Sequence, residues 1–191
     1  MSSWDIENHL RLFPHASMHE HEGRLWGHWM IGNNYKRKHG YHGEYPPSYI
    51  ERVKSLFPGG RNCLHVFSGS VDCEEDATFD INPDSGADWV GNAEEIGDIL
   101  GLSRIQMIMA DPPYTTNDAK IYGYKMPRKN IVMQQLRKII ARDGVLVWLD
   151  TRRPMYRKVE WRLSGIIGLD CGTNRIYRGV FIFEPEGGKA D

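Results

Sequence analysis

Apolar residues along this chain fall into two patterns, short and largely apolar segments and longer stretches with helical spacing. Largely apolar segments of strand length occupy residues 63–67, 77–81, 87–90, 105–110 and 144–150. Apolar residues recur at helical spacing over residues 48–57, 93–100, 128–141 and 154–163. Strands that alternate with helices, with central strands that are apolar throughout, are typical of a parallel sheet. We therefore predict an α/β fold with a mostly parallel central sheet.

The end of the chain predicts a β-hairpin. Residues 165–170 and 179–184 are apolar segments on either side of a glycine-containing turn. Because the two strands of a hairpin run in opposite directions, we expect this C-terminal β-hairpin to add an antiparallel edge to the sheet.

The first 60 residues are rich in His, Gly, Tyr and Trp and show little periodicity before the helix predicted at 48–57. We interpret residues 1–60 as a polar arm and a helix that pack on a catalytic core of residues 61–191, all within a single domain. Four histidines of this arm lack the spacing of a metal site, and we predict no metal ion. They are His15, His19, His21 and His28.

Length and composition favour a globular protein of the cytoplasm. The chain has 191 residues, of which 40% are hydrophobic and 26% charged. No apolar run approaches the roughly 20 residues that span a bilayer, and the N-terminus lacks the layout of a signal peptide. The three cysteines, Cys63, Cys73 and Cys171, are scattered along the chain. Neither a disulfide framework nor a CxxC metal site is therefore expected.

The net charge of −1 conceals an uneven distribution of charge along the chain. Residues 72–111 contain eleven acids and one base, whereas residues 115–183 contain fourteen bases and five acids. A basic C-terminal half suits a polyanion such as nucleic acid. The alternative is that folding brings the two halves together and that their charges pair.

Residues with distinctive chemistry follow four of the predicted strands, at the ends where open α/β sheets bind ligands. After the first strand come residues that let a ligand approach the backbone, namely Phe67, Ser68, Gly69 and Ser70. The second strand ends at Asp80, placed as the ribose-binding acid is in nucleotide-binding folds. The third is followed by Asn92, whose amide could pair with the edge of an adenine ring, and by Ala93. The fourth ends in Asp111, Pro112, Pro113 and Tyr114.

These strand ends resemble those of S-adenosylmethionine-dependent methyltransferases that act on exocyclic amino groups of bases, most often adenine N6 in DNA. The [D/N/S]-P-P-[Y/F/W] motif of that family matches Asp111 to Tyr114 (DPPY). Its Phe-x-Gly-x-Gly loop is matched in part by residues 67–70, and Val71 stands where the second glycine would be. The resemblance covers residues 60–183. It implies a Rossmann-like class I methyltransferase fold with seven strands, and S-adenosyl-L-methionine as the cofactor.

The same resemblance implies which residues bind the cofactor and which carry the chemistry. The implied cofactor-binding residues are Phe67, Ser68, Gly69, Ser70, Asp80, Asn92, Ala93 and Asp111. The implied catalytic residues are Asp111, Pro112, Pro113 and Tyr114. An aromatic amine is a poor nucleophile because its lone pair is delocalised, and hydrogen bonds that accept both amino hydrogens favour a pyramidal nitrogen. Asp111 would accept a hydrogen bond from one amino hydrogen, and a carbonyl of the stiff Pro-Pro turn would accept one from the other. The ring of Tyr114 would stack on a flipped-out base.

Two features distinguish this chain from the usual members of the family. Only residues 71–76 separate the first strand from the second, so the helix that normally covers the cofactor loop must be shortened or absent. The chain also has no room for a separate recognition domain. Recognition would have to come from residues 1–60, from the loop 115–127 or from a second subunit.

Aromatic side chains interspersed with basic ones suit contact with a nucleic acid. The candidates are Lys120, Tyr122, Tyr124, Lys125, Arg152 and Arg153. An ordinary surface loop and a solvated turn explain the same residues equally well. Residues 41–47 stand where related enzymes place a segment over the cofactor, and a simple turn is the alternative there.

Three functions fit the sequence. The first is adenine-N6 methylation of DNA, which we favour over RNA as the partner. The second keeps the site and changes the base, to guanine N2 in RNA or cytosine N4 in DNA. The third is a non-catalytic, methyltransferase-like subunit that binds nucleic acid. A homodimer or a recognition subunit is compatible with each of them.

Overall fold

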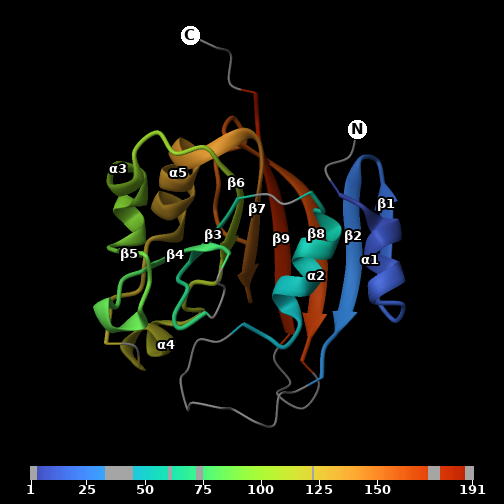
Figure 1. Ribbon diagram of the computed structural model, residues 1–191, viewed down its shortest axis with the longest axis horizontal. Helices are drawn as coiled ribbons and strands as arrows, with labels where there is room; N and C mark the ends of the chain where they lie inside the picture. The colour runs from blue at the N-terminus through green and yellow to red at the C-terminus, as the bar shows by residue number, and fades with distance from the viewer. Residues whose placement is uncertain are drawn as a thin grey trace.

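The computed structural model describes residues 4–32, 45–59, 62–71, 75–121, 123–171 and 177–187, which form one mixed sheet with helices against both of its faces (Figure 1). The strands are β1 (Ser17–His21), β2 (Arg24–Met30), β3 (Cys63–Val66), β4 (Ala77–Asp80), β5 (Trp89–Val90), β6 (Ile105–Ala110), β7 (Ile140–Asp150), β8 (Trp161–Asp170) and β9 (Tyr177–Pro185). The helices are α1 (Ile6–Leu12), α2 (Tyr49–Leu56), α3 (Ile96–Leu100), α4 (Thr116–Ile121) and α5 (Lys129–Ile139). Two 3-10 turns are η1 (Pro83–Ser85) and η2 (Ala93–Glu95).

The nine strands lie in the order β1-β2-β8-β9-β7-β6-β3-β4-β5. The strands from β5 to β7 run parallel, and β9 is antiparallel to both of its neighbours, β7 and β8. From β3 the chain builds outward through β4 and β5, then returns to place β6 on the other side of β3. This reversal between β3 and β6 is the topological switch point of a Rossmann-like sheet. The predicted α/β fold with a mostly parallel sheet is confirmed.

Two apolar layers hold the sheet between its helices. Leu64 and Val66 of β3 pack with α3 and α5 in one cluster, whereas Cys63 packs with α1 and α2 in the other. Successive strand residues point to opposite faces, so an unbroken apolar run is what a strand buried on both faces requires. This is why the apolar runs for β3, β6 and β7 predicted strands correctly.

The predicted C-terminal hairpin forms, but its position at the edge was wrong. Strands β8 and β9 pair antiparallel, and β9 lies between β7 and β8 inside the sheet. The edge is instead occupied by β1, which pairs with β2, and β2 runs parallel to β8. The interpretation of the start of the chain as a polar arm was therefore wrong for residues 17–30, which contain β1 and β2. These two strands extend the seven expected by resemblance to nine.

The helix predicted at 154–163 is absent. Residues 154–160 contain no helix, and Trp161 begins β8. The segment is held by aromatic packing instead, because the Tyr156 ring meets the edge of Phe183 at 4.9 Å between centroids. The indole Nε1 of Trp161 donates to the carbonyl of Met133 in α5, at 3.1 Å. Tertiary packing thus overrode the helical spacing of the apolar residues.

The crossover from β3 to β4 contains no helix in its described residues, 67–71 and 75–76. In the described part of the chain, no helix is long and apolar enough to cross a membrane.

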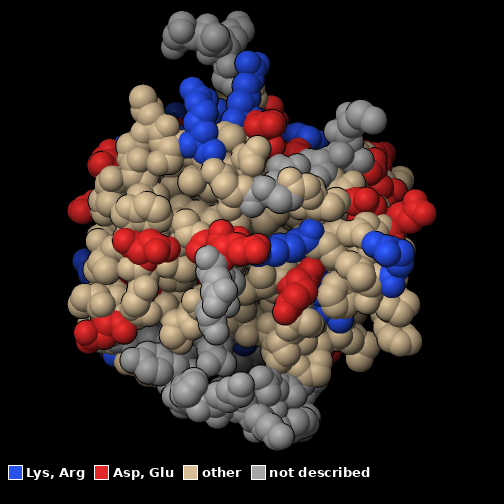
Figure 2. Space-filling model, viewed as in Figure 1, with Lys and Arg blue, Asp and Glu red and all other residues tan. Residues whose placement is uncertain are grey.

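Charges of the acidic and basic halves are partly paired. Glu94 forms an ion pair with Arg128, and Asp98 forms an ion pair with Lys138. On the face shown in Figure 2, acidic and basic side chains lie interspersed rather than in separate fields. Charge pairing across the two halves, the alternative left open by the sequence, therefore accounts for part of the uneven distribution.

Candidate active site

The candidate residues gather at the carboxyl ends of the parallel strands, beside the switch point between β3 and β6. Their strand ends lie in the lower half of the view in Figure 1, where the arrow of β7 points. Because adjacent parallel strands end at the same edge of the sheet, residues far apart in sequence meet there.

Asp111 lies directly after β6 and accepts a hydrogen bond from the hydroxyl of Tyr114, at 2.6 Å between Oη and Oδ1. The other carboxylate oxygen, Oδ2, accepts no hydrogen bond from the described residues. Burial raises the pKa of Asp111 to about 7, although the bond from Tyr114 and the charge of Arg178 favour the ionised form. This aspartate is therefore near its titration midpoint at neutral pH.

Arg178 is a residue of the site that the sequence did not reveal. Its guanidinium carbon lies 5.2 Å from the ring centroid of Tyr114, within the range of a cation–π contact. The ring on which a base was expected to stack thus already carries a cation. Arg178 comes from β9, and it reaches the site because β9 lies next to β7, with Gly179 opposite Asp150.

Two buried polar atoms of this region have no hydrogen-bond partner among the described residues. They are the hydroxyl of Tyr49 and Nε of Arg178. Burial and the negative charge of Asp111 raise the pKa of Tyr49 well above its usual value, so the phenol stays protonated. Buried donors without partners are rare in folded proteins, and both of these side chains interact electrostatically with Asp111.

The loop after β3 is anchored by Asp80. The backbone N–H of Gly69 donates to Oδ2 of Asp80 at 2.9 Å, and that of Asn82 donates to Oδ1 at 2.8 Å. Both Phe67 and Gly69 have positive φ, at 62° and 53°. This is strained for Phe67 and easy for glycine. Of the other predicted cofactor residues in this loop, Ser68 is buried and Ser70 is exposed. Each carboxylate oxygen of Asp80 keeps a lone pair that could accept a hydrogen bond from a hydroxyl group.

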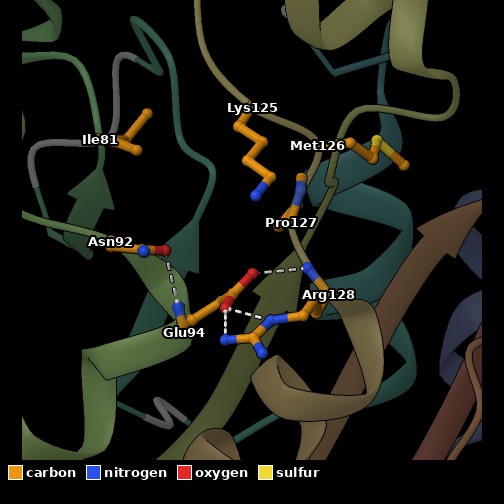
Figure 3. A pocket seen from close by; sticks show the side chains of 7 residues that line it. All are labelled: Ile81, Asn92, Glu94, Lys125, Met126, Pro127 and Arg128. Atoms are coloured by element: carbon orange, nitrogen blue, oxygen red, sulfur yellow. Dashed lines mark hydrogen bonds and ion pairs between the residues drawn. The ribbon is translucent and has the colours of Figure 1, made fainter.

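A cavity of about 390 Å³ opens beside Ile81, the residue that follows Asp80 in the chain (Figure 3). Its lining residues are Ile81, Asn92, Glu94, Lys125, Met126, Pro127 and Arg128. Oδ1 of Asn92 accepts from the N–H of Glu94 at 3.0 Å, which orients the amide at this wall. The carboxylate of Glu94 accepts from the backbone N–H of Arg128 at 2.7 Å and from its Nε at 2.8 Å. These bonds tie the loop before α5 to η2.

The remaining predicted residues are dispersed around this edge. Ala93, the first residue of η2, is buried in the core, and Lys125 lines the cavity. Lys120, Arg152 and Arg153 are exposed and Tyr124 is half-buried, whereas Tyr122 lies outside the described residues. Of the segment 41–47, residues 41–44 lie outside the described part. The described Tyr45 stacks on Tyr49 at 5.1 Å.

A second polar cluster lies under β3, on the face covered by α2. The side chains of Cys63, His65 and Asp76 place a sulfur, a nitrogen and an oxygen within 4.8 Å of one another. Nε2 of His65 is 3.0 Å from Oδ2 of Asp76, and Nζ of Lys54 is 2.7 Å from the same oxygen. The carboxylate is therefore already neutralised by a lysine, an arrangement that disfavours a metal ion.

Comparison with known proteins gives no match to a family model or to a curated protein sequence. Among solved structures, the chain is similar to TrmN from Thermus thermophilus, with a TM-score of 0.48 and 14% identity over 66% of this chain and 44% of TrmN. It is similar to a TehB-like SAM-dependent methyltransferase from Corynebacterium glutamicum, with a TM-score of 0.46 and 13% identity over 70% and 85% of the two chains. It is also similar to the fibrillarin pre-rRNA processing protein of Methanococcus jannaschii, with a TM-score of 0.39 and 12% identity over 66% and 67%.

This chain spans less than half the length of TrmN. The assignment of the fold rests on strand order and direction, with an antiparallel β9 inserted between β7 and β8. That order is the Rossmann-like class I methyltransferase fold implied by the resemblance, and the predicted fold class is confirmed.

Proposed function

We propose that this protein transfers a methyl group from S-adenosyl-L-methionine to the exocyclic amino group of a nucleobase, with adenine N6 in DNA as the expected target. The observation that carries the proposal is the carboxylate of Asp111. It lies at the end of a central strand and is followed by two prolines, and within the described residues its Oδ2 accepts no hydrogen bond. We assign to this oxygen the role of accepting a hydrogen bond from the amino group of the target base.

The residues around Asp80 fit the cofactor. The cavity of about 390 Å³ is large enough for a nucleoside. The side chains of Ile81, Met126 and Pro127 supply apolar walls for an adenine ring, and the amide of Asn92 supplies a polar edge. Asp80 would accept the ribose hydroxyls, and the loop at Gly69 would lie along the rest of the molecule. When bound, the cofactor supplies an electrophilic methyl group on a sulfonium centre.

The role of Asp111 is to accept one amino hydrogen while a carbonyl of the Pro112–Pro113 turn accepts the other. These bonds localise the nitrogen lone pair and align it for attack. The proline rings restrict the backbone of this turn, so the carboxylate and the carbonyl that accept the hydrogen bonds move little during the reaction. Only the ionised carboxylate can accept without donating, and the active form is therefore the deprotonated one.

The ring of Tyr114 must accommodate the base. One face of the ring carries the guanidinium of Arg178, so the base either takes the opposite face or displaces the cation. A displaced Arg178 would remain beside the target nucleotide, where its charge suits a phosphate.

A methylation assay with nucleoside mass spectrometry tests the proposal. The wild type is incubated with isotope-labelled S-adenosylmethionine and either unmethylated DNA or unmodified RNA, beside Asp111→Ala and Asp111→Asn. Asp98→Asn, a change at an exposed acid on α3, is the matched control. We expect labelled N6-methyladenine from DNA with wild type and control, and loss of at least about 100-fold with both Asp111 variants.

Other outcomes are equally informative. Label on guanine or cytosine would keep the reaction and replace the base. A second function, a non-catalytic nucleic-acid-binding subunit, is favoured by one observation, that the Gly69 N–H is already bonded to Asp80. Absence of both label and cofactor binding in the wild type would contradict methyl transfer and support that second function.

A further inference from the structure

One face of the sheet beyond β9 carries exposed aromatic rings and, within the described residues, no covering helix. Trp26 and Met30 of β2 are 36% and 71% exposed, while the alternate residues Leu25 and Trp29 are buried on the side of α1 and α2. Tyr177, at the start of β9, is 61% exposed. We refer to the surface formed by His19, Trp26, His28, Met30 and Tyr177 as the open face.

The open face results from how β7 connects to β8. Residues 151–160 pass from one strand to the other without a helix. Tyr156 rests on Phe183 of β9, so this segment covers β9 and leaves β2 and β1 beyond its reach. The β1–β2 pairing register then sets His19 opposite Trp26 on the uncovered side.

Glycines make this surface flat. Gly168 of β8 stands between His28 on one neighbouring strand and Gly179 on the other. A Cβ at Gly168 would collide with the hydroxyl of Tyr177, so that ring lies directly over the glycine. The rings of Tyr177 and His28 are nearly parallel, with 15° between their planes and 6.1 Å between their centroids. Flat rings on a flat sheet offer stacking faces rather than a groove for an aliphatic side chain.

Charges of both signs lie around the open face: Asp170 stands between Met30 and Tyr177 in the strand register, and three arginines supply positive charge. Arg24 lies opposite His21 at one end of the β1–β2 pair. Arg152 and Arg153 are exposed at the start of the segment beside β9. None of these three arginines forms an ion pair with another described residue. Cations next to exposed aromatic rings are the combination that binds the backbone and the bases of a single strand.

We infer that the open face binds single-stranded nucleic acid and leads it to the candidate active site. Stacking requires unpaired bases, which a duplex does not offer. The open face and the site share one edge of the sheet, because Met30 lies opposite Asp170, Asp170 opposite Tyr177, and Gly179 opposite Asp150 at the end of β7. At that edge the guanidinium of Arg178 reaches Tyr114 from the other face of β9. This inference rests on the proposed methyl transfer for its purpose, and it assigns recognition of the strand to β1 and β2.

Binding is tested with the full chain by fluorescence anisotropy, using labelled oligo(dT) and oligo(U) of about 12 nucleotides and a duplex of equal length. Trp26→Ala and Tyr177→Ala remove stacking rings, and Trp26→Phe and Tyr177→Phe keep them. Trp89→Ala is the matched control because Trp89 is 42% exposed on β5, at the opposite edge of the sheet. Calorimetric titration with S-adenosylmethionine and thermal melts are made on every variant.

We expect at least one of the two single strands to bind more tightly than the duplex, with affinity that falls as salt rises. Each alanine variant should weaken binding about 5- to 150-fold, the value of stacking one base. The phenylalanine variants and Trp89→Ala should bind within about twofold of wild type. The comparison of oligo(dT) with oligo(U) shows whether the open face prefers single-stranded DNA or single-stranded RNA.

Three results would overturn the inference: no binding of either single strand, equal losses with Trp89→Ala, or a dimer in light scattering that Trp26→Ala dissociates. The last would make the open face an interface between two copies. Cofactor titration separates this inference from the proposed function. If the cofactor binds and the strands do not, the inference alone fails. If the strands bind and the cofactor does not, the methyltransferase proposal fails instead.

Discussion

The ionisation of Asp111 gives the candidate site a pH dependence that can be measured. Burial raises its pKa to about 7 in the free protein, and only the carboxylate accepts an amino hydrogen without competition. We therefore expect kcat/KM for methyl transfer to rise tenfold per pH unit below about 7 and to level off above it. Initial rates between about pH 5.5 and 9 would measure this profile. A flat profile through pH 7 would remove Asp111 from the role of acceptor.

Arg178 should set the position of that profile. Its positive charge lowers the pKa of Asp111, so Arg178→Met should raise this pKa and move the acid limb to higher pH. Arg178→Lys keeps a charge and should shift the limb less. The control is Arg104→Met, which removes an exposed charge just before β6, at the opposite end of that strand from Asp111. Equal profiles for Arg178→Met and the control would show that Arg178 does not act through Asp111.

The hydrogen bonds of His9 define one neutral tautomer, and from this we predict how the stability of the fold depends on pH. Ser55 Oγ donates to the carbonyl of Arg52, so it must accept from Nδ1 of His9, at 2.7 Å. Nε2 of His9 accepts from the indole of Trp29 at 3.0 Å. Neither nitrogen can take a further proton without breaking a bond, and burial lowers the pKa of His9 from 6.5 to about 4.

The unfolded chain therefore binds a proton at His9 between pH 6.5 and 4 that the folded chain does not. This contribution to stability is full above pH 6.5 and should fall by up to about 3 kcal/mol as the pH drops to 4. Urea unfolding of wild type, His9→Asn and the exposed-site variant His15→Gln at both pH values would measure it. His9→Asn should lose much of the difference between the two pH values, and His15→Gln should keep it.

At the scale of single elements, α5 is tied to β7 by a buried ion pair. Nζ of Lys129, in the first turn of α5, lies 2.7 Å from Oδ2 of the fully buried Asp150. Lys129→Met would leave that carboxylate without its cation and should cost about 3–5 kcal/mol. Lys138→Met breaks an exposed pair on the same helix and should cost at most about 1 kcal/mol.

Denaturant unfolding of the two variants gives both values. A third variant, Lys129→Met with Asp150→Asn, removes the uncompensated charge and should recover part of the loss. Equal costs for Lys129→Met and Lys138→Met would mean that water reaches Asp150.

Comparison of elements shows where the sequence was sufficient. Strands β3, β6 and β7 are buried on both faces, and their largely apolar segments predicted them. In β2 the buried Leu25 and Trp29 lie among exposed and half-buried residues, several of them apolar, a pattern that a helical or irregular segment can also contain. Its place in the sheet depends on pairing with β8, more than 130 residues later in the chain. The apolar spacing at 154–163 failed for the same reason, since β8 is stabilised by strands on both sides.

The candidate site was predictable to the extent that its residues are neighbours in sequence. Asp111 and Tyr114 belong to one motif, and their hydrogen bond joins residues three positions apart. Arg178 reaches Tyr114 only because β9 is inserted between β7 and β8, a matter of topology that no local pattern contains. The anchoring of the Gly69 loop by Asp80 likewise depends on two adjacent parallel strands.

At the scale of the whole molecule, the uneven charge along the chain is an incomplete guide to the surface. Glu94 and Asp98 of the acidic half pair with Arg128 and Lys138 of the basic half. The exposed arginines that remain without ion pairs in the described part include Arg24, Arg152 and Arg153. Affinity for a polyanion should therefore depend on these positions more than on net charge, which is −1.

Binding of the cofactor should be visible in the stability of the entire chain, because a ligand that binds only the folded state shifts the unfolding equilibrium. At 100 times its Kd, S-adenosylmethionine should add about 2.7 kcal/mol, which raises Tm by about 5–10 °C for a domain of this size. Thermal melts with increasing S-adenosylmethionine would measure the shift, with ATP as a control for generic adenine binding. Asp80→Ala should abolish the shift. Asp80→Asn keeps an acceptor for the Gly69 N–H and should lose only part of it. If Asp80→Asn and Asp80→Ala behave alike, the charge of Asp80 binds the ligand directly; if Asp80→Asn behaves like wild type, Asp80 acts by holding the loop in place.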